Sequence, residues 1–179
     1  MNENPPKASF LKKIKPELLM AFLAVLISFL TLFVYLYQSS LMKTQQMMSV
    51  WPHVTFGPTW DSDYLALNLI NKGVGPALVK QMHVEINNQK IEGIQNLMDY
   101  VPDSLRSEFN YSSLFPGQVI MVGENIQLFQ TSNPKTIGYF LKLLRDGKIR
   151  IEVCYCSIYQ DCWVSSGISV MESDCDSVL

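Results

Sequence analysis

The sequence has few of the residues that most often carry catalysis or bind nucleic acid. It contains two histidines, and its 14 Lys and Arg residues are outnumbered by 16 Asp and Glu residues. After residue 37, ten basic residues stand against fourteen acidic ones, and they form no basic run. Because neutralisation of phosphates by Lys and Arg supplies most of the affinity for nucleic acids, this composition argues against a nucleic-acid partner.

Catalytic motifs are also missing. No G-x-S-x-G elbow, H-E-x-x-H motif or S-x-x-K motif occurs in the context that its chemistry requires. Gly73 and Gly75 form a short G-x-G, but no third glycine follows them, so we interpret residues 71–77 as a turn. His53 and His83 are interpreted as surface residues. The sequence therefore predicts a protein that is not an enzyme and that binds no cofactor.

One long stretch lacks charge altogether. Residues 18–37 contain no charged side chain, and Ser28 and Thr31 are their polar interruptions. About 20 apolar residues are enough for a helix to cross the hydrocarbon core of a bilayer. The next residues, 38–41, offer no Ala-x-Ala-like cleavage site, which favours a retained anchor over a signal peptide. We expect a single transmembrane helix that contacts the lipid bilayer through residues 18–37.

The charges beside this stretch indicate its orientation. Residues 1–17 carry four lysines, whereas Lys43 is the one basic residue among the first thirty that follow the stretch. Loops rich in Lys and Arg stay on the cytoplasmic side of a membrane, so residues 1–17 are predicted to be a cytoplasmic N-terminus. Residues 38–49 are predicted to continue the helix as a polar stalk, and the remainder lies outside the cytoplasm.

Residues 50–170 have the pattern of a domain that is mainly β. Apolar residues alternate in Tyr64–Ile70 and in Leu78–Asn88, as expected for strands that bury one face. The other predicted strands span residues 50–56, 119–129, 148–157 and 162–168, and residues 123–125 are a bulge or hairpin tip within the fourth. Two short helices are predicted at 94–101 and after the capping residue Asn133. About seven strands with two inserted helices predict an antiparallel, immunoglobulin-like β-sandwich.

The same patterns predict which residues form the core. The expected core positions are Leu65, Leu67, Leu69, Leu78, Met82, Val84, Ile86, Ile137, Phe140, Leu141, Leu144, Ile149, Ile151, Val153 and Tyr155. On the last of these strands, Cys154 and Cys156 alternate with the core residues and are therefore expected on the wetter face. Residues 171–179 are acidic and predicted to be a flexible tail.

Four cysteines, Cys154, Cys156, Cys162 and Cys175, are concentrated near the end of the chain. An even number of cysteines outside the cytoplasm predicts disulfides. If residues 148–157 and 162–168 form a hairpin, Cys156 and Cys162 lie opposite each other and can form a bridge. Cys175 then lies on the flexible tail, and the partners of Cys154 and Cys175 stay open.

The cysteines also allow a second interpretation, in which they serve thiol exchange or bind zinc. A zinc site would use Cys154, Cys156 and Cys162 with Cys175 or His53, because thiolates bind zinc tightly. The spacing lacks the paired C-x-x-C of structural zinc sites. The sequence therefore predicts no metal site, and a thiol-redox or metal-dependent envelope protein is kept as the alternative.

Two segments carry a resemblance to known proteins. Asn71–Ala77, after a predicted strand, and Cys154–Trp163, near the end, resemble segments of small uncharacterised bacterial proteins that have one N-terminal membrane helix and an extracytoplasmic β-domain. The resemblance implies a protein of the bacterial inner membrane with its domain in the periplasm. It implies no activity and assigns no role to any residue.

Aromatic residues near the last hairpin suggest how such a domain works. Tyr155, Tyr159 and Trp163 lie close together in sequence, and exposed aromatics often anchor protein interfaces. Edge strands of a β-domain can also recruit an extended segment of another protein. We therefore expect a non-catalytic accessory protein that binds a protein partner in the membrane or periplasm, with the Cys156–Cys162 hairpin as a rigid contact element.

Overall fold

The computed structural model describes residues 15–106 and 109–175. Most of the predicted cytoplasmic N-terminus, Glu108 and the last four residues of the predicted tail lie outside these ranges. The chain divides into two compact units, Met1–Gln46 and Met47–Leu179, which are described separately. We call the second unit the β-domain.

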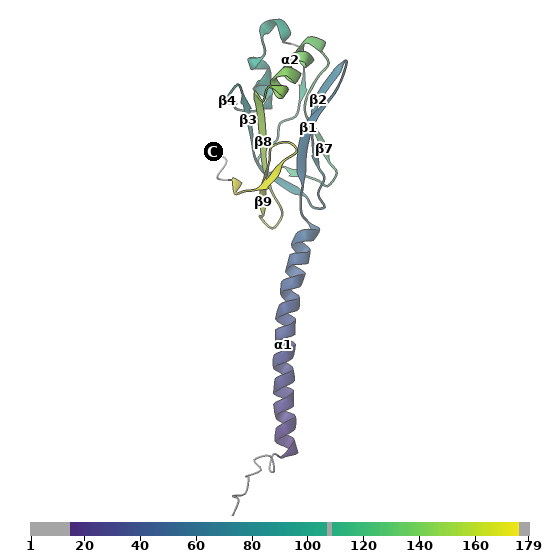
Figure 1. Cartoon of the computed structure of the whole chain (residues 1–179), viewed down its shortest axis with the longest axis vertical. Coiled ribbons are helices and arrows are strands. Elements are labelled where there is room, and N and C mark those ends of the chain that lie inside the picture. Colours follow the sequence, from purple (N-terminus) through teal and green to yellow (C-terminus); the bar gives the residue numbers. More distant parts are fainter. Residues whose placement is uncertain (1–14, 107–108, 176–179) are drawn as a thin grey trace, which may run out of the picture. The chain divides into compact units, whose positions relative to one another are not determined.

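The first unit consists of α1, which spans Pro16–Ser49 and is long and apolar enough to cross a membrane (Figure 1). The side chains of Ser28 and Thr31 donate hydrogen bonds to the carbonyls of Ala24 and Ile27, each over 2.8 Å. Hydroxyls bonded to the preceding turn place no unpaired polar group on the apolar surface. Length and composition fit either a membrane anchor or a signal sequence. The predicted stalk, 38–49, is helical as expected.

The β-domain contains two antiparallel sheets. The first sheet has four strands in the order β1-β2-β7-β5, which span Val54–Asp61, Tyr64–Asn71, Asn125–Thr131 and Asn110–Tyr111. The second sheet has the order β10-β9-β8-β3-β4, with β6 also beside β3. Its strands span Val170–Glu172, Cys162–Ser165, Ile149–Cys156, Ala77–Ile86, Gln89–Ile91 and Val119–Ile120. The described residues thus form ten strands rather than about seven.

One core cluster joins the two sheets. It includes Leu65, Leu67 and Leu69 from β2 together with Val153 and Tyr155 from β8, as the alternation predicted. The backbone N–H of Val54 in β1 donates to the hydroxyl of Tyr155 over 3.1 Å, which ties the first sheet to the second through the core. Antiparallel sheets and short helices are therefore confirmed, and the immunoglobulin-like topology stays a prediction.

A bulge in β3 corrects the predicted core. The pairing of β3 with β8 shifts between Val79 and Gln81, so Lys80 is an extra residue in β3. One extra residue reverses which side chains face inward. Val84 and Ile86 beyond the bulge are buried as predicted, but before it Val79 is buried and Leu78 is half-buried.

The predicted strand 119–129 is also wrong as a single element. Its first part, β6, belongs to the second sheet, and its second part, β7, belongs to the first sheet. Gly123, at φ 75°, lies in the turn between them, where a positive φ favours glycine. The chain therefore crosses from one sheet to the other at the predicted tip.

Buried Asn71 holds this crossover in place. Its side-chain N–H groups donate to the carbonyls of Gly75 over 2.8 Å and Ile120 over 3.1 Å. Its Oδ1 accepts from the backbone N–H groups of His53 over 3.2 Å and Gly73 over 3.0 Å. A buried amide is stable when its donors and acceptor are all used. Three segments that are distant in sequence therefore meet at one side chain.

The turn that Asn71 begins needs its glycines. A Cβ atom at Gly73 or Gly75 would collide with the backbone of residues 50–53, which lies directly against the turn. This close approach accounts for both glycines as residues of a turn, as expected, and no nucleotide-binding role is needed to explain them.

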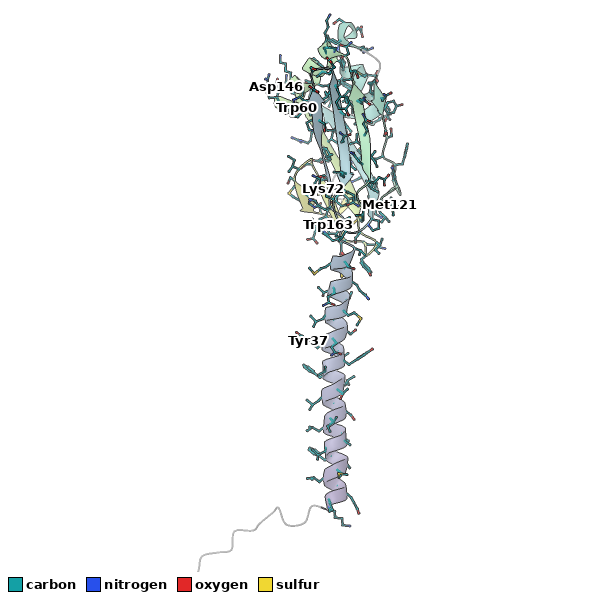
Figure 2. All side chains as sticks on the ribbon, turned by 90° about the vertical axis from the view of Figure 1, so that its right-hand side faces the viewer. Tyr37, Trp60, Lys72, Met121, Asp146 and Trp163 are labelled. Carbon is teal, nitrogen blue, oxygen red and sulfur yellow. A yellow bond between two sulfur atoms is a disulfide. The ribbon has the colours of Figure 1, made fainter. Side chains whose placement is uncertain are left out.

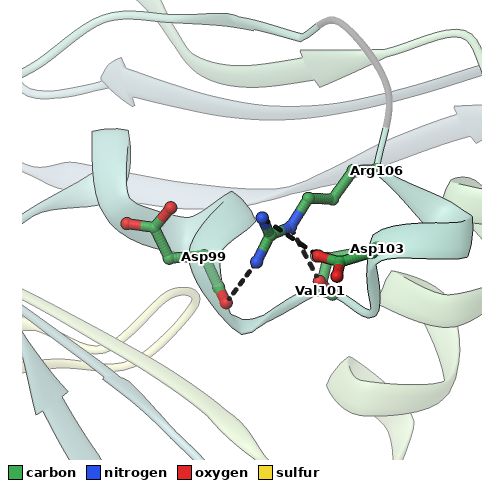
Figure 3. Close-up of polar contacts among 4 residues, drawn as sticks. All are labelled: Asp99, Val101, Asp103 and Arg106. Atoms are coloured by element: carbon green, nitrogen blue, oxygen red, sulfur yellow. Dashed lines mark hydrogen bonds and ion pairs between the residues drawn. The ribbon is translucent and has the colours of Figure 1, made fainter.

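The segment after β4 contains two short 3-10 helices. The first, η1, spans Ile94–Tyr100, and the second, η2, spans Asp103–Leu105. Arg106 donates to the carbonyls of Val101 and Asp99, each over 3.1 Å, and pairs with Asp103 over 3.1 Å (Figure 3). The predicted helix at 94–101 thus exists with its apolar face buried, but its turns are 3-10 rather than α.

The second α-helix, α2, spans Pro134–Arg145. The side chain of Asn133 accepts hydrogen bonds from Lys135 N–H over 3.0 Å and Thr136 N–H over 3.4 Å, as expected for an N-cap. Ile137 and Phe140 are buried as predicted, but Leu143 takes the place expected for Leu141 and Leu144, which are half-buried.

Candidate functional site

The hairpin formed by β8 and β9 contains the disulfide that the sequence predicted. Cys156 and Cys162 are direct partners across the two strands, and their Cα atoms are 4.0 Å apart. The N–H of Ser157 donates to the carbonyl of Asp161 over 2.8 Å, and Gln160 takes a positive φ of 69° in the connection. A covalent bond and a tight turn therefore fix the tip of this hairpin.

The second disulfide joins Cys154 to Cys175, with 5.7 Å between their Cα atoms. Cys175 is therefore not on a flexible arm: β10 and the residues after it are held against the sheet, and the side chain of Gln81 donates to the carbonyl of Cys175. Both Cys154 and Cys156 are 1% exposed, so the expected wetter face is wrong. They do face away from the core, but the C-terminal segment covers them.

The predicted aromatic cluster is mostly unavailable to a partner. Tyr155 is fully buried, and burial raises the pKa of its hydroxyl, so it is a core residue and not an interface residue. Trp163 is partly buried against the core, with its ring 6.0 Å from that of Tyr155. Tyr159 alone is largely open, at 46% exposed. Of the three aromatic residues predicted to form a contact patch, only Tyr159 at the hairpin tip is largely exposed.

A different surface brings exposed apolar side chains together. Two adjoining hollows, of about 480 and 550 Å³, share Pro58 and Leu144. We call them the open groove, which is lined chiefly by Pro58, Trp60, Leu141, Leu144, Ile149 and Ile168. Volumes of this size are typical of ligand and peptide sites. Trp60 is 59% exposed and Ile168 is 91% exposed, so the groove presents a large apolar surface to solvent.

Strand β1 forms one wall of the open groove, and it is an edge strand. Asp61 pairs with Tyr64 across a two-residue turn, so alternate residues of β1 bond to β2. The backbone groups of Phe56, Pro58 and Trp60 therefore point away from β2. At Phe56 this outer edge is already used, because its N–H donates to the carbonyl of Gly167 over 3.1 Å. Beyond Pro58 the edge runs along the groove.

Basic side chains border the same groove. Lys142 and Arg145 line the hollow that contains Trp60, and Arg150 lines the other hollow. Arg150 pairs with Glu85 over 3.5 Å, and both side chains are partly exposed. Three cations beside an apolar surface favour a ligand that combines apolar and negatively charged groups.

Sequence patterns gave little sign of this groove. We predicted that the strand containing β1 ends at Phe56, before Pro58 and Trp60. A signal was present, since Trp60 stands directly before Asp61-Ser62-Asp63, which is typical of a tight turn. Extending the strand to that turn would have placed Trp60 at the end of a hairpin. Trp60 and Trp163 lie toward opposite ends of the β-domain (Figure 2).

The two histidines are less open than the sequence suggested. Both are half-buried, and His53 Nδ1 and His83 Nε2 are buried without a hydrogen-bond partner among the described residues. Burial, with a smaller contribution from Lys90, lowers the pKa of His83 below its ordinary value. The carboxylates of Glu152 and Glu85 oppose this lowering of the pKa only in part.

The sulphur atoms of Cys156, Cys162 and Cys175 lie within 4.8 Å of one another, which is close enough for one metal ion to contact all three. His53 is not a member of this group. All four cysteines are oxidised to disulfides in the structure, and a metal ligand must be a thiolate. In this oxidised state the three sulphur atoms are not available as metal ligands.

No protein-family model matches this chain, and a comparison with curated proteins finds no significant match.

Proposed function

We propose that this chain is a non-catalytic, single-pass protein of the bacterial inner membrane, with its N-terminus in the cytoplasm, whose periplasmic β-domain binds an extended segment of another envelope protein. Three features support the placement: the apolar helix α1, the lysines before it and the two disulfides. Disulfides persist outside the cytoplasm, and lysines favour the cytoplasmic side.

The open groove carries the proposed binding function. Soluble domains seldom expose a tryptophan beside several aliphatic side chains unless the surface has a partner. Trp60 is 59% exposed beside Leu141 and Leu144 in the described structure. The lining of the groove is chiefly apolar, and its charged residues, Lys142, Arg145 and Arg150, are basic.

The shape of the groove favours an extended protein segment as its occupant. A strand laid along β1 beyond Pro58 meets the outward backbone groups of Trp60, and its alternate side chains enter the two hollows. The basic residues Lys142, Arg145 and Arg150 favour a carboxylate next to the apolar anchors of that segment. The expected ligand is therefore an apolar stretch flanked by Asp or Glu.

Photo-crosslinking in intact cells tests this proposal. A photoreactive amino acid placed at Leu144 should form a discrete crosslinked product with another envelope protein, and one placed at Tyr111 should not. Tyr111 is a fitting control because it is 50% exposed on β5, at the other edge of the first sheet. Crosslinks of equal yield at both positions, or none at Leu144, would count against the groove.

Substitution of the anchor residue supplies the second test. Trp60→Ala should lower the yield of the crosslinked product about tenfold or more, as expected for an aromatic anchor at the centre of an interface. Trp51→Ala is the matched control, because Trp51 is also exposed, at 45%, and lies outside the groove. Tyr159→Ala measures any contribution of the hairpin tip to binding. If it lowers the yield of the crosslinked product more than Trp60→Ala does, the partner binds the hairpin and not the groove.

The membrane placement is tested separately. A retained anchor predicts that the mature chain isolated from membranes still contains residues 18–37, which intact mass measurement shows directly. Protease added to spheroplasts should digest the β-domain. Loss of residues 18–37 from the mature chain would instead identify α1 as a signal sequence.

A further inference from the structure

The two disulfides touch each other. The Sγ atoms of Cys156 and Cys175, which belong to different bridges, are 3.8 Å apart. Cys154 and Cys156 lie on the same face of β8, two residues apart, and the C-terminal segment brings Cys175 over both. Thiol–disulfide exchange needs a thiolate beside a disulfide sulphur, and this arrangement places Cys156 Sγ 3.8 Å from Cys175 Sγ.

The four cysteines differ in their access to solvent. Cys156, Cys162 and Cys175 line an open cleft of about 650 Å³, which also contains Lys80. Cys156 is 1% exposed, whereas Cys162 is half-buried. Within this bridge an external thiolate therefore reaches the sulphur of Cys162 before that of Cys156, and Cys156 becomes the leaving group.

We propose that the two disulfides form an exchange pair, in which reduction of the Cys156–Cys162 bridge by an external dithiol moves the C-terminal segment from Cys154 to Cys156. One thiolate of the dithiol attacks Cys162 Sγ and displaces the Cys156 thiolate. The second thiol of the reductant then releases Cys162 as a thiol, and the reductant leaves as a disulfide. Two electrons and one proton have passed from the dithiol to the protein, and the second proton of the dithiol is in the solvent.

The second step is internal. The Cys156 thiolate attacks Cys175 Sγ, the Cys154–Cys175 bond breaks, and a Cys156–Cys175 bond forms. Cys154 leaves as a thiolate and takes a proton from solvent. The product has one disulfide and two thiols, Cys154 and Cys162, so the internal step changes the position of the bridge and not the oxidation state.

Two charged residues of opposite sign, Lys80 and Asp174, line the cleft in which this step takes place. Lys80 is the extra residue of the β3 bulge, and it lines the cleft beside the three sulphur atoms. A nearby cation stabilises a thiolate. Asp174 lines the same cleft and acts in the opposite direction. The exchange gives the chain a response to dithiol reductants in its compartment. Cys162 directly precedes Trp163, which lies toward the end of the β-domain opposite Trp60 (Figure 2).

The decisive experiment uses the full chain in detergent with Cys162→Ser. This change leaves Cys156 without its partner, so the proposal places the free thiol on Cys154 and the bridge between Cys156 and Cys175. Alkylation with a maleimide under non-reducing conditions, digestion and mass spectrometry locate both. Label chiefly on Cys154 supports the exchange, and label chiefly on Cys156 with an intact Cys154–Cys175 bridge overturns it.

A matched control is Cys175→Ser. It leaves Cys154 free, two residues from Cys156 on the same strand, which places their Cβ atoms about 6.5 to 7 Å apart and outside disulfide range. The label should stay on Cys154 with the Cys156–Cys162 bridge intact. A label on Cys162 instead would mean that exchange needs no particular placement of Cys175, and it would overturn the proposed role of that contact.

Wild-type protein provides a measurement that does not depend on the folding of a variant. One equivalent of dithiothreitol, followed by rapid alkylation, should yield a crosslinked peptide that contains Cys156 and Cys175. Lys80→Gln should slow its appearance severalfold and leave its identity unchanged. Products restricted to the two original bridges and their fully reduced forms would overturn the proposal.

Discussion

The outer face of the second sheet and the open groove beside β1 differ in whether another part of the chain covers them. The C-terminal segment covers the outer face at Cys154 and Cys156 and is fixed there by the Cys154–Cys175 disulfide. The groove at Trp60 and Leu144 is left uncovered by the described residues. The covered face is committed to the chain itself, whereas the groove is available to another molecule.

The comparison also separates two kinds of apolar helix residue. Phe140 and Leu144 lie one turn apart on α2, and Phe140 is buried in the core while Leu144 lines the groove. Phe140→Ala should destabilise the β-domain by about 3–5 kcal/mol, because it leaves a cavity in a packed core. Leu144→Ala should cost about 1 kcal/mol or less, because its side chain already contacts solvent.

Urea unfolding of the full chain in detergent, followed by tryptophan fluorescence, measures both values. If both variants lose the same free energy of unfolding, Leu144 is buried in solution as Phe140 is. The groove would then be closed, and the distinction between an open and a covered surface would be wrong.

The two disulfides should contribute unequally to the covered face. They span sequence separations of 21 and 6 residues. A bridge restricts the unfolded chain more when its loop is longer, so loss of Cys154–Cys175 should cost about 3 kcal/mol and loss of Cys156–Cys162 about 2 kcal/mol. Double replacement of each pair by Ser, with the urea midpoint as readout, compares them without leaving an odd thiol. The reverse order would indicate that the hairpin, and not the C-terminal segment, holds this face together.

The smallest expected effect is a pH dependence on the same covered face. His83 lies opposite Glu152 on that face, and burial keeps its pKa below 6.5 in the folded chain. The unfolded chain binds a proton near pH 6.5, so the contribution of neutral His83 to stability is complete above that pH and is lost as the pH falls toward the folded pKa. Urea midpoints at pH 7.5 and 5.5 should therefore differ more for the wild type than for His83→Gln. An unchanged difference would assign the dependence to other groups.

The elements that the sequence predicted correctly are those whose signals are local. The cap at Asn133, the alternation in β2 and the Cys156–Cys162 hairpin each depend on residues within one element or two adjacent ones, and all three are present. The long uncharged stretch likewise predicted α1. Local propensity and hydrophobic period agree at these places, which is why a single sequence is enough.

The errors arose where one segment is controlled by a distant one. The bulge at Lys80 reverses the faces of β3, and nothing in the adjacent residues marks it. Cys154 and Cys156 are buried because Cys175 returns over them, which alternation within β8 cannot reveal. Trp60 belongs to the groove because α2 lies beside it without covering it. Each of these outcomes is a tertiary effect that overrides a local pattern.

Asn71 has a mechanical consequence for a domain that is attached by one end. A pull on the chain at residue 50 enters the β-domain through residues 50–53, and the Asn71 side chain bonds that segment at His53, the turn at Gly73 and Gly75, and the crossover at Ile120. A pulling force is therefore shared among three segments. It does not act on the hydrogen bonds between β1 and β2 alone. Replacement of this single amide would remove the four hydrogen bonds that join these three segments.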